Sequence, residues 1–371
     1  TAANKMIGVE ARRFAWMSET AELGKTAMLP ATDDSTWQQQ LHGFGPKFYQ
    51  LGPLPESLDP AAIDAELAKL TQVDPAVPVT IDGQVYHWQP YAFSWRYGNE
   101  HDAGHQGFHG LKGKISEDFI RLGNITVGVA GAMILQPEAH TRYYLWSAAM
   151  TDEAVVATIL TSDNRPASRN ASQVVAPAAF YVNGKRVNDL QQPVSLQPGA
   201  NPVFIRYDDF GQSHVVLRRS EVLFPAQSEP LAMPWYKDPG VIPFDLQGGE
   251  ASAEWFRFLS APGTTAIQLQ AKSREAVQVW FDGKPMSDRG NGRFVVQQPV
   301  NTAGVVAIRL VPEIGCSGGA AIPESVSIET SGAGSMALGD WSKMGVLNNY
   351  SGGVRYHKTF TVSEQTAKGQ V

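Results

Sequence analysis

The chain has 371 residues, more than one hydrophobic core usually serves, so two or three domains are expected. Charged residues make up only 18% of it, while glycine and proline number 35 and 24, which favours an all-β chain rich in turns. The net charge of -6 with scattered lysines and arginines excludes a nucleic-acid partner, and no apolar run is long enough to cross a membrane.

Residues 1–120 are predicted to form a first unit, a tryptophan- and histidine-rich β region with one helical insertion. Asp59 is suited to cap a helix and Pro60 to begin it, and Ile63, Leu67 and Leu70 then fall on one helical face. Glycine and proline punctuate the surrounding stretches densely, which predicts loops. We therefore expect a short helix that lies against a sheet.

Two later stretches repeat one pattern, and they predict β-sandwiches over residues 121–223 and 224–330. Each has an aromatic strand, a turn followed by lysine, and an alternating strand that ends in Ile-Arg; the turns are Asn183-Gly184-Lys185 and Asp282-Gly283-Lys284. Such turns are the strongest short-range hairpin signal, because both central positions of a type I′ turn need φ > 0. The chain is therefore predicted to be mainly β, with tandem antiparallel sandwiches, and Trp146, Trp255 and Trp280 are expected in their cores.

Residues 331–371 begin with a linker of glycine and serine and continue into strand patterns around Val354 and Phe360. An isolated hairpin is marginally stable, so this stretch is predicted to be the start of a truncated further module. Thr1 is not an initiator methionine and no apolar leader follows it, which predicts a processed protein or a piece of a longer one.

Several motifs resemble a known family: Tyr181-Val182-Asn183-Gly184-Lys185, then Leu196-Gln197-Pro198-Gly199-Ala200-Asn201, and a tail from Gly339-Asp340-Trp341 to Tyr356. They are similar to the galactose-binding-like jelly-roll modules of large glycoside hydrolases, including the β-galactosidase-like and α-L-rhamnosidase-like groups. The resemblance covers roughly the last two thirds of the chain, and its motifs specify a fold better than a substrate.

The resemblance implies a secreted protein, extracellular or periplasmic. It also implies two partners, an oligo- or polysaccharide and a catalytic domain of the same parent protein. The catalytic carboxylates of such enzymes usually lie on a separate (β/α)8 barrel, and no strand and helix alternation of that length occurs in this sequence. Sugar binding needs no cofactor, although a structural calcium ion in a jelly-roll loop is compatible with the family.

The stretch from Phe93 to Gly110 mixes aromatic rings, a guanidinium, carboxylates, imidazoles and glycines. Sugars are bound by this mixture, because an aromatic ring covers the apolar C–H face while planar charged groups bind pairs of hydroxyls. The glycines favour a loop, where binding groups commonly lie above a rigid sheet. The predicted ligand-binding residues are Trp95, Arg96, Tyr97, Glu100, Asp102, His105, Gln106 and His109.

The same loop holds the candidates for catalysis, Glu100, Asp102 and His105, since glycosidases generally use two carboxylates across the scissile bond. The alternative is that both carboxylates are solvated or paired with the nearby arginine and histidines. His101, His105 and His109 have helical spacing, but intervening glycines argue against a helix, and hydrogen-bonding loop histidines are favoured over a metal site.

The stretch Gly315-Cys316-Ser317-Gly318-Gly319 is superficially similar to a nucleophile loop. It lacks the Gly-x-Ser-x-Gly frame, so a turn between strands is predicted instead. Cys316 is the single cysteine, which excludes an intrachain disulfide, and it has no evident charge partner in sequence that would activate it.

Three functions stay open at this point. The leading hypothesis is the carbohydrate-recognising and scaffolding β-sandwich portion of a glycoside hydrolase that acts on polysaccharide. The first alternative is that the chain is itself a glycosidase or polysaccharide lyase that uses the loop from Trp95 to His109. The second alternative is that the sandwiches are purely structural spacers.

Overall fold

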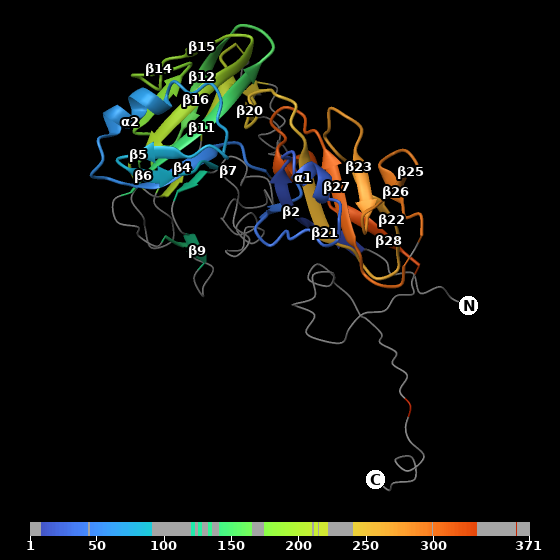
Figure 1. Cartoon of the computed structure of the whole chain (residues 1–371). Helices are drawn as coiled ribbons and strands as arrows, with labels where there is room; N and C mark the ends of the chain where they lie inside the picture. Colours follow the sequence, from blue (N-terminus) through green and yellow to red (C-terminus); the bar gives the residue numbers. More distant parts are fainter. Residues whose placement is uncertain are drawn as a thin grey trace.

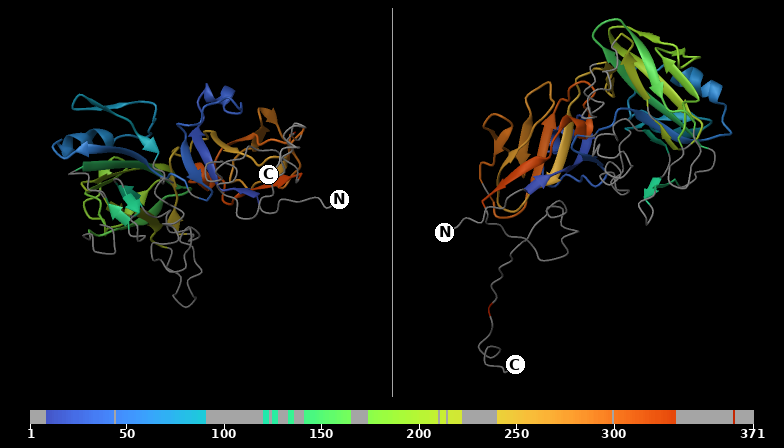
Figure 2. Two further views of the ribbon diagram at one scale, coloured as in Figure 1. Left: turned by 90° about the horizontal axis from the view of Figure 1, so that it is seen from below. Right: turned by 180° about the vertical axis from the view of Figure 1, so that it is seen from behind.

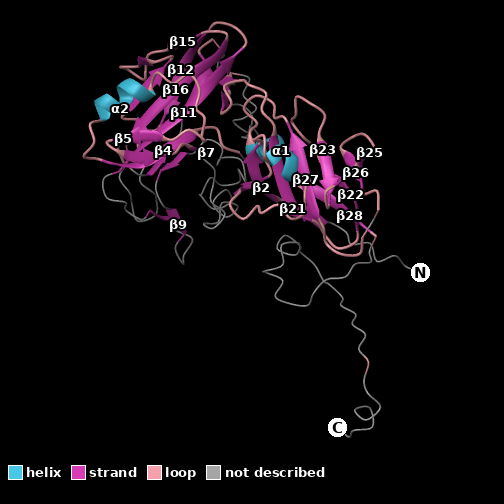
Figure 3. Cartoon of the chain, in the orientation of Figure 1, coloured by secondary structure: helices cyan, strands magenta, loops and turns pink. Residues whose placement is uncertain are grey.

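The computed structural model describes residues 9–43, 45–90, 120–122, 125–127, 133–135, 141–164, 174–209, 211–213, 215–221, 240–298, 300–331 and 361. This part of the chain is mainly β and forms two antiparallel β-sandwiches that lie side by side (Figures 1, 2 and 3), which confirms the predicted fold class. Its α-helices are α1 (Leu23–Thr26) and α2 (Pro60–Leu67). Within the same residues, no helix has the length and apolarity of a membrane span.

The first sandwich, here called the split sandwich, takes its strands from two separate stretches of the chain. One sheet has the order β24 (Lys284–Pro285), β23 (Gln278–Phe281), β27 (Val305–Leu310), β21 (Glu254–Leu259), β2 (Arg13–Ser18), β3 (Gln38–Leu41). The facing sheet has the order β1 (Val9–Ala11), β28 (Val326–Thr330), β22 (Thr264–Gln268), β26 (Arg293–Val295), β25 (Ser287–Asp288). Apolar side chains of both sheets, such as Phe14, Phe256 and Ile328, fill the core between them.

The second sandwich, the inserted sandwich, lies between these two stretches in the chain. Its larger sheet has the order β14 (Lys185–Arg186), β13 (Ala179–Val182), β16 (Gly199–Tyr207), β11 (Thr141–Thr151), β4 (Tyr49–Pro55), β7 (Gln89–Pro90), and β20 (Phe244–Asp245) also pairs with β11. The facing sheet has the order β15 (Val194–Leu196), β12 (Val155–Thr161), β18 (Val215–Arg219), β19 (Val241–Ile242). Tyr143, Ile205 and Leu217 belong to the core between the two sheets.

Three two-stranded ladders complete the described strands. They pair β5 (Val79–Ile81) with β6 (Gln84–Tyr86), β8 (Ile120–Leu122) with β17 (Gly211–Ser213), and β9 (Ile125–Val127) with β10 (Met133–Leu135).

The strands of residues 9–55 are divided between the two sandwiches. β1 to β3 pair within the split sandwich, where Val9 lies opposite Ile328 and Met17 opposite Trp255, whereas β4 pairs with β11 of the inserted sandwich. The chain therefore crosses from one sandwich to the other between β3 and β4, and returns after β20. The sequence predicted a first unit over residues 1–120, whereas the described strands of this stretch are shared between the two sandwiches.

The two sandwiches have the same strand order. In the larger sheets, β24–β23–β27–β21–β2–β3 corresponds to β14–β13–β16–β11–β4–β7. Helix α1 lies in the chain between β2 and β3, as α2 lies between β4 and β7. The register is also repeated, because Arg309 lies opposite Trp255 and Arg206 opposite Tyr144. The repeated sequence pattern thus marks a structural repeat, with the inserted sandwich placed inside its twin.

The two predicted hairpin turns are confirmed. Asn183 and Gly184 have φ of 51° and 73°, and Asp282 and Gly283 have φ of 47° and 76°, as a type I′ turn requires. The side chains also stabilise the neighbouring strand, since Asp282 Oδ1 accepts a hydrogen bond from the backbone N–H of Val305 at 2.8 Å. The lysine after each turn is exposed.

Helix α2 forms where the sequence predicts it. The Asp59 side chain accepts a hydrogen bond from the Ala61 N–H at 3.0 Å, Pro60 occupies the first turn, and Ile63 and Leu67 are buried. The helix ends at Leu67, so Leu70 packs on the same apolar cluster from the segment after the helix. This cluster covers the outer face of the larger sheet and includes Trp146. Trp146 and Trp255 are fully buried, but in clusters separate from the cores between the sheets where they were expected. Trp280 is half-buried.

Candidate functional site

The predicted sugar-binding loop lies outside the described residues, as do its candidates for catalysis. This holds for Trp95, Arg96, Tyr97, Glu100, His101, Asp102, His105, Gln106 and His109. The tail from residue 332 is also outside them, apart from Thr361. What the structure does describe is the residue from which the loop departs, Pro90, at the end of β7.

Pro90 lies where the two sandwiches meet. β7 is the edge strand of the larger sheet in the inserted sandwich, and the Pro90 carbonyl accepts a hydrogen bond of 3.2 Å from Gln38 Nε2 in β3 of the split sandwich. β3 is itself an edge strand. The segment with the predicted site residues therefore begins at the seam between two sheet edges.

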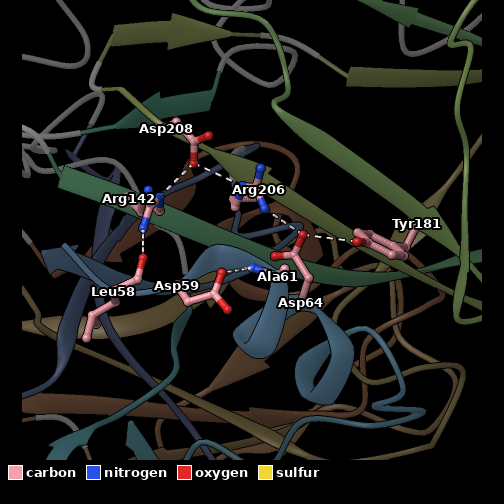
Figure 4. A network of polar contacts seen from close by, with 8 residues as sticks. All are labelled: Leu58, Asp59, Ala61, Asp64, Arg142, Tyr181, Arg206 and Asp208. Carbon is pink, nitrogen blue, oxygen red and sulfur yellow. Dashed lines mark hydrogen bonds and ion pairs between the residues drawn. The ribbon is translucent and has the colours of Figure 1, made fainter. Parts of the chain in front are cut away.

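Among the described residues, charged side chains gather on the outer face of the larger sheet in the inserted sandwich (Figure 4). Asp64 of α2 accepts a hydrogen bond of 2.6 Å from Arg206 of β16, and the side chains of this ion pair are only 4% and 11% exposed. Tyr181 donates its hydroxyl hydrogen bond to the same Asp64 oxygen at 3.0 Å. Helix α2 is thus joined to two strands of the sheet through one carboxylate.

Asp208 extends this cluster toward solvent. Its Oδ1 lies 3.0 Å from Nε of both Arg142 and Arg206, and its side chain is 40% exposed. Arg142 also donates a hydrogen bond to the Leu58 carbonyl, in the segment before α2. Two guanidiniums and two carboxylates therefore neutralise one another across the sheet and its helical cover.

The phenols of this cluster stay protonated. Burial raises the pKa of Tyr144, and the negative charge of Asp64 raises it further. Burial also raises the pKa of Tyr181, with the hydrogen bond to Asp64 as the next cause. A neutral phenol donates a hydrogen bond and is no base, so this arrangement is suited to holding α2 on the sheet rather than to proton transfer.

The split sandwich has a corresponding pair on the same face. Both nitrogens Nε and Nη2 of Arg309 donate to the Glu19 carboxylate at 2.7 Å, and Trp255 Nε1 donates to it at 2.7 Å. The hydrogen bonds from Arg309 are the main cause that lowers the pKa of Glu19. Trp255 packs against Trp280 with ring centroids 5.1 Å apart and ring planes tilted by 34°. The repeat thus preserves an arginine that binds a carboxylate from the segment covering the sheet.

A third polar cluster lies where the chain returns to the split sandwich, beside the loop of residues 315–319. Glu254, the first residue of β21, is only 1% exposed, and its Oε2 accepts hydrogen bonds of 2.8 Å from Trp16 Nε1 and from the Gly318 N–H. Gln247 Nε2 lies 3.3 Å from the other oxygen. Burial raises the pKa of Glu254 to about 7, and the negative charge of Asp245 adds to the effect.

Asp245 is the second buried carboxylate of this cluster, and it is 2% exposed. It lies in β20, opposite Ala148 of the inserted sandwich, and its two oxygens accept hydrogen bonds from the N–H groups of Gly249 at 2.6 Å and Gly315 at 3.0 Å. Gly315 belongs to the split sandwich, between β27 and β28. Asp245 therefore joins a strand of one sandwich to a loop of the other.

The loop of residues 315–319 lies between β27 and β28, where the sequence predicts a turn, and its last two residues begin the 3-10 helix η4 (Gly318–Ala321). It contacts both segments in which the chain crosses between the sandwiches. It binds Asp245 and Glu254 on one side, and on the other the Gly43 N–H donates to the Gly319 carbonyl at 2.8 Å. Gly45 packs so closely on Ser317 that a Cβ atom there would overlap the Ser317 carbonyl oxygen.

Sequence reasoning missed these clusters. Glu254 does carry a signal, because it is a charged residue at the start of an otherwise apolar stretch, where an unpaired charge would be costly. Arg257 of the same strand carries the same signal, and its buried side chain pairs with Asp34 at 2.9 Å. Asp64 had no such signal, since a carboxylate on a short surface helix is ordinary. No group of three or more histidine, cysteine or acidic residues that could hold a metal ion occurs among the described residues.

Comparisons with known proteins assign no family. No protein-family model and no curated protein matches the sequence. Among solved structures, an anti-sigma factor domain-containing protein is similar at 9% identity over 57% of this chain and 84% of its own, with a TM-score of 0.19. An α-L-rhamnosidase from Dictyoglumus thermophilum is similar at 10% identity over 88% of this chain, with a TM-score of 0.16, and the chain spans about half of it, 49%. At these TM-scores neither likeness assigns a fold or an activity.

Proposed function

We propose that the chain is a carbohydrate-recognising and scaffolding β-sandwich portion of a glycoside hydrolase, with recognition by the loop from Trp95 to His109. The position of Pro90 is the observation that carries the proposal. Its edge strand is held to Gln38 of the other sandwich, so the loop departs from a seam that two rigid sheets define. Binding loops commonly project from such fixed supports.

Three arginines that bind the segments covering the larger sheets support a scaffolding role. Arg206, Arg309 and Arg257 each donate to carboxylates or backbone carbonyls of the segment that covers their sheet. These contacts hold each sheet to its cover and stiffen it. The galactose-binding-like motifs and the mixture of aromatic and planar charged side chains in the loop are the grounds for a sugar ligand.

Calorimetric titration of the chain with neutral and acidic oligosaccharides tests the proposal. We expect a dissociation constant between millimolar and micromolar, equivalent to about 4 to 8 kcal/mol. Trp95→Ala and Arg96→Ala are expected to weaken binding at least tenfold, whereas the exposed turn residue gives a matched control, Lys185→Ala, with no effect.

Two outcomes would contradict this function. Absence of binding across the whole panel would remove sugar recognition and leave the spacer hypothesis. Hydrolysis or lyase cleavage of a glycan that is abolished by Glu100→Gln or Asp102→Asn would instead make the chain itself the enzyme.

A further inference from the structure

The two sandwiches each have an Asn-Gly pair in a turn. Asn183-Gly184 lies between β13 and β14, Asn291-Gly292 lies between β25 and β26, and both asparagines are exposed. In such a pair the backbone nitrogen of the glycine can attack the side-chain amide carbon of the asparagine, because no glycine side chain shields that nitrogen. The two asparagines also share a φ of 51° and 52°, so their surroundings in the fold decide whether they react alike.

The side chain of Asn183 is fixed in the inserted sandwich. Its Nδ2 donates a hydrogen bond of 2.9 Å to Oδ1 of Asn201, which is fully buried and whose Oδ1 also accepts from the Gln197 N–H at 2.9 Å. The Asn183 N–H donates to the Pro202 carbonyl at 2.8 Å. Attack by the Gly184 nitrogen requires the Asn183 amide to turn away from Asn201, and the hydrogen bond between them must break first.

The side chain of Asn291 has no such anchor. Within the described part of the chain its backbone carbonyl accepts a hydrogen bond from Gln268 Nε2, and its side-chain amide makes no hydrogen bond. Gly290, Asn291 and Gly292 are three consecutive residues with positive φ, of 80°, 52° and 74°. The glycines on both sides give the backbone additional conformational freedom. The Asn291 amide is therefore free to rotate toward the Gly292 nitrogen.

We propose that Asn291 is a site of spontaneous deamidation and isomerisation, and that the anchored Asn183 is protected from the same reaction. The Gly292 nitrogen forms a bond to Cγ of Asn291, the bond from Cγ to the amide nitrogen breaks, and ammonia leaves with the proton of the Gly292 N–H. Water then opens the succinimide ring at one of its two carbonyl carbons. Opening at the backbone carbonyl gives isoaspartate, and opening at the side-chain carbonyl gives aspartate.

Isoaspartate at position 291 alters the hairpin of β25 and β26, because it inserts a methylene group into the main chain before Gly292. Gly292 packs so closely on Leu269 that a Cβ atom there would overlap the Leu269 carbonyl oxygen, and the Leu269 N–H donates to the Gly292 carbonyl at 3.0 Å. The next residue, Arg293, lies opposite Gln268 in the pairing of β26 with β22. The lengthened turn does not fit these contacts, so the hairpin loosens from β22.

Ageing of the full chain in mildly alkaline buffer, followed by peptide mapping with mass spectrometry, tests the proposal. Deamidation replaces NH2 by OH and is measured as a mass increase, and isoaspartate is identified by labelling with an isoaspartyl methyltransferase. We expect Asn291 to react about tenfold faster than Asn183 in the folded protein, because the hydrogen bond to Asn201 must break before Asn183 reacts. In urea the two sites are expected to react at similar rates, since the anchor is lost.

Variants attribute the difference to the anchor. Asn201→Ala removes the acceptor, so Asn183 is expected to react about tenfold faster while the rate at Asn291 stays the same. Asn291→Gln is the control for the reactive site, because a glutamine must close a six-membered ring and does so much more slowly. If Asn201→Ala fails to fold, the comparison of the folded with the urea-denatured wild type still tests the protection of Asn183.

The effect on the hairpin has its own measurement. The isoaspartate form is separated by anion exchange through its added negative charge, and its amide hydrogen exchange is compared with that of the unmodified chain. We expect faster exchange in β25 and β26, with β27 unchanged as the internal reference.

Equal rates at Asn183 and Asn291 in the folded protein would overturn the proposal, as would an Asn291 that reacts in urea but not in the folded chain. A folded Asn201→Ala that leaves the rate at Asn183 unchanged would remove the protective role of the anchor. The inference is independent of sugar binding, because no glycan takes part in the reaction or in its measurement.

Discussion

Arg206 and Arg309 occupy the same position in the two sandwiches, and each binds a carboxylate from the segment that covers its sheet. The copies differ in burial: the side chains of Arg206 and Asp64 are 11% and 4% exposed, those of Arg309 and Glu19 26% and 23%. Removal of one partner from a buried ion pair leaves an uncompensated charge, whereas a partly hydrated pair contributes little. The repeat therefore allows the contribution of a buried ion pair to stability to be compared with that of a partly exposed pair at the same position of the fold.

Asp64→Asn is expected to lower the free energy of unfolding by about 3 kcal/mol, because Arg206 and Arg142 then share the single carboxylate of Asp208. Glu19→Gln should cost about 1 kcal/mol or less, since water reaches Arg309. Urea unfolding followed by fluorescence measures both. Equal losses in the two variants would mean that burial of the pair does not decide its contribution.

The Glu19 pair also predicts a pH dependence. Hydrogen bonds from Arg309 lower the pKa of Glu19 below its ordinary value of 4.5. The unfolded state therefore binds the proton first, and the stabilisation is present above 4.5 and is lost as pH falls through the lowered value. The difference in unfolding free energy between wild type and Glu19→Gln is expected to shrink below this range; a difference that grows with acid would refute the assignment.

Gly45→Ala tests the packing of the first crossing against the loop of residues 315–319. Its added Cβ would overlap backbone atoms of Ser317, which cannot rotate away, so a loss of about 2 kcal/mol is expected. Gly24→Ala is the control, because its Cβ would meet only the flexible Glu19 side chain at 3.5 Å and alanine favours helix α1. Thermal unfolding should show a lower melting temperature for Gly45→Ala alone.

Asn201 is a fully buried amide that fixes the turn before β16. Its Oδ1 accepts from the Gln197 N–H and from Asn183 Nδ2, both at 2.9 Å, and its Nδ2 donates to the Gln197 carbonyl at 2.7 Å. Asn201→Ala leaves these groups unpaired and is expected to cost about 2 to 3 kcal/mol in denaturant unfolding. The exposed Gln191→Ala should change the midpoint hardly at all, and a neutral Asn201→Ala would show that water replaces the amide.

Local features were predictable from the sequence because their causes are local. The hairpin turns at Asn183 and Asp282 follow from residues that tolerate positive φ, and α2 follows from its cap and proline. The same signal at Asp82-Gly83, with φ of 48° and 75°, marks the β5–β6 hairpin that the sequence prediction omitted.

Long-range pairing could not be predicted in the same way. β2 is apolar and buried on both faces at its centre, and nothing in it specifies β21 as its neighbour, since an apolar strand indicates burial and not a partner. The cluster of Glu254 and Asp245 could not be predicted for a related reason. Glu254 becomes unusual only when Asp245 and the loop of residues 315–319 are brought to it by two crossings of the chain.

The division of one sandwich around the other sets an order of events during biosynthesis. The inserted sandwich has all of its described strands available once residue 245 has left the ribosome. The strands β1 to β3 must wait for β21 to β28, a delay on the order of 15 to 60 seconds at typical elongation rates. For that interval their apolar faces, including those of Phe14 and Trp16, lack the partners that β21 to β28 supply, so the segment of β1 to β3 needs chaperone protection until those strands are made.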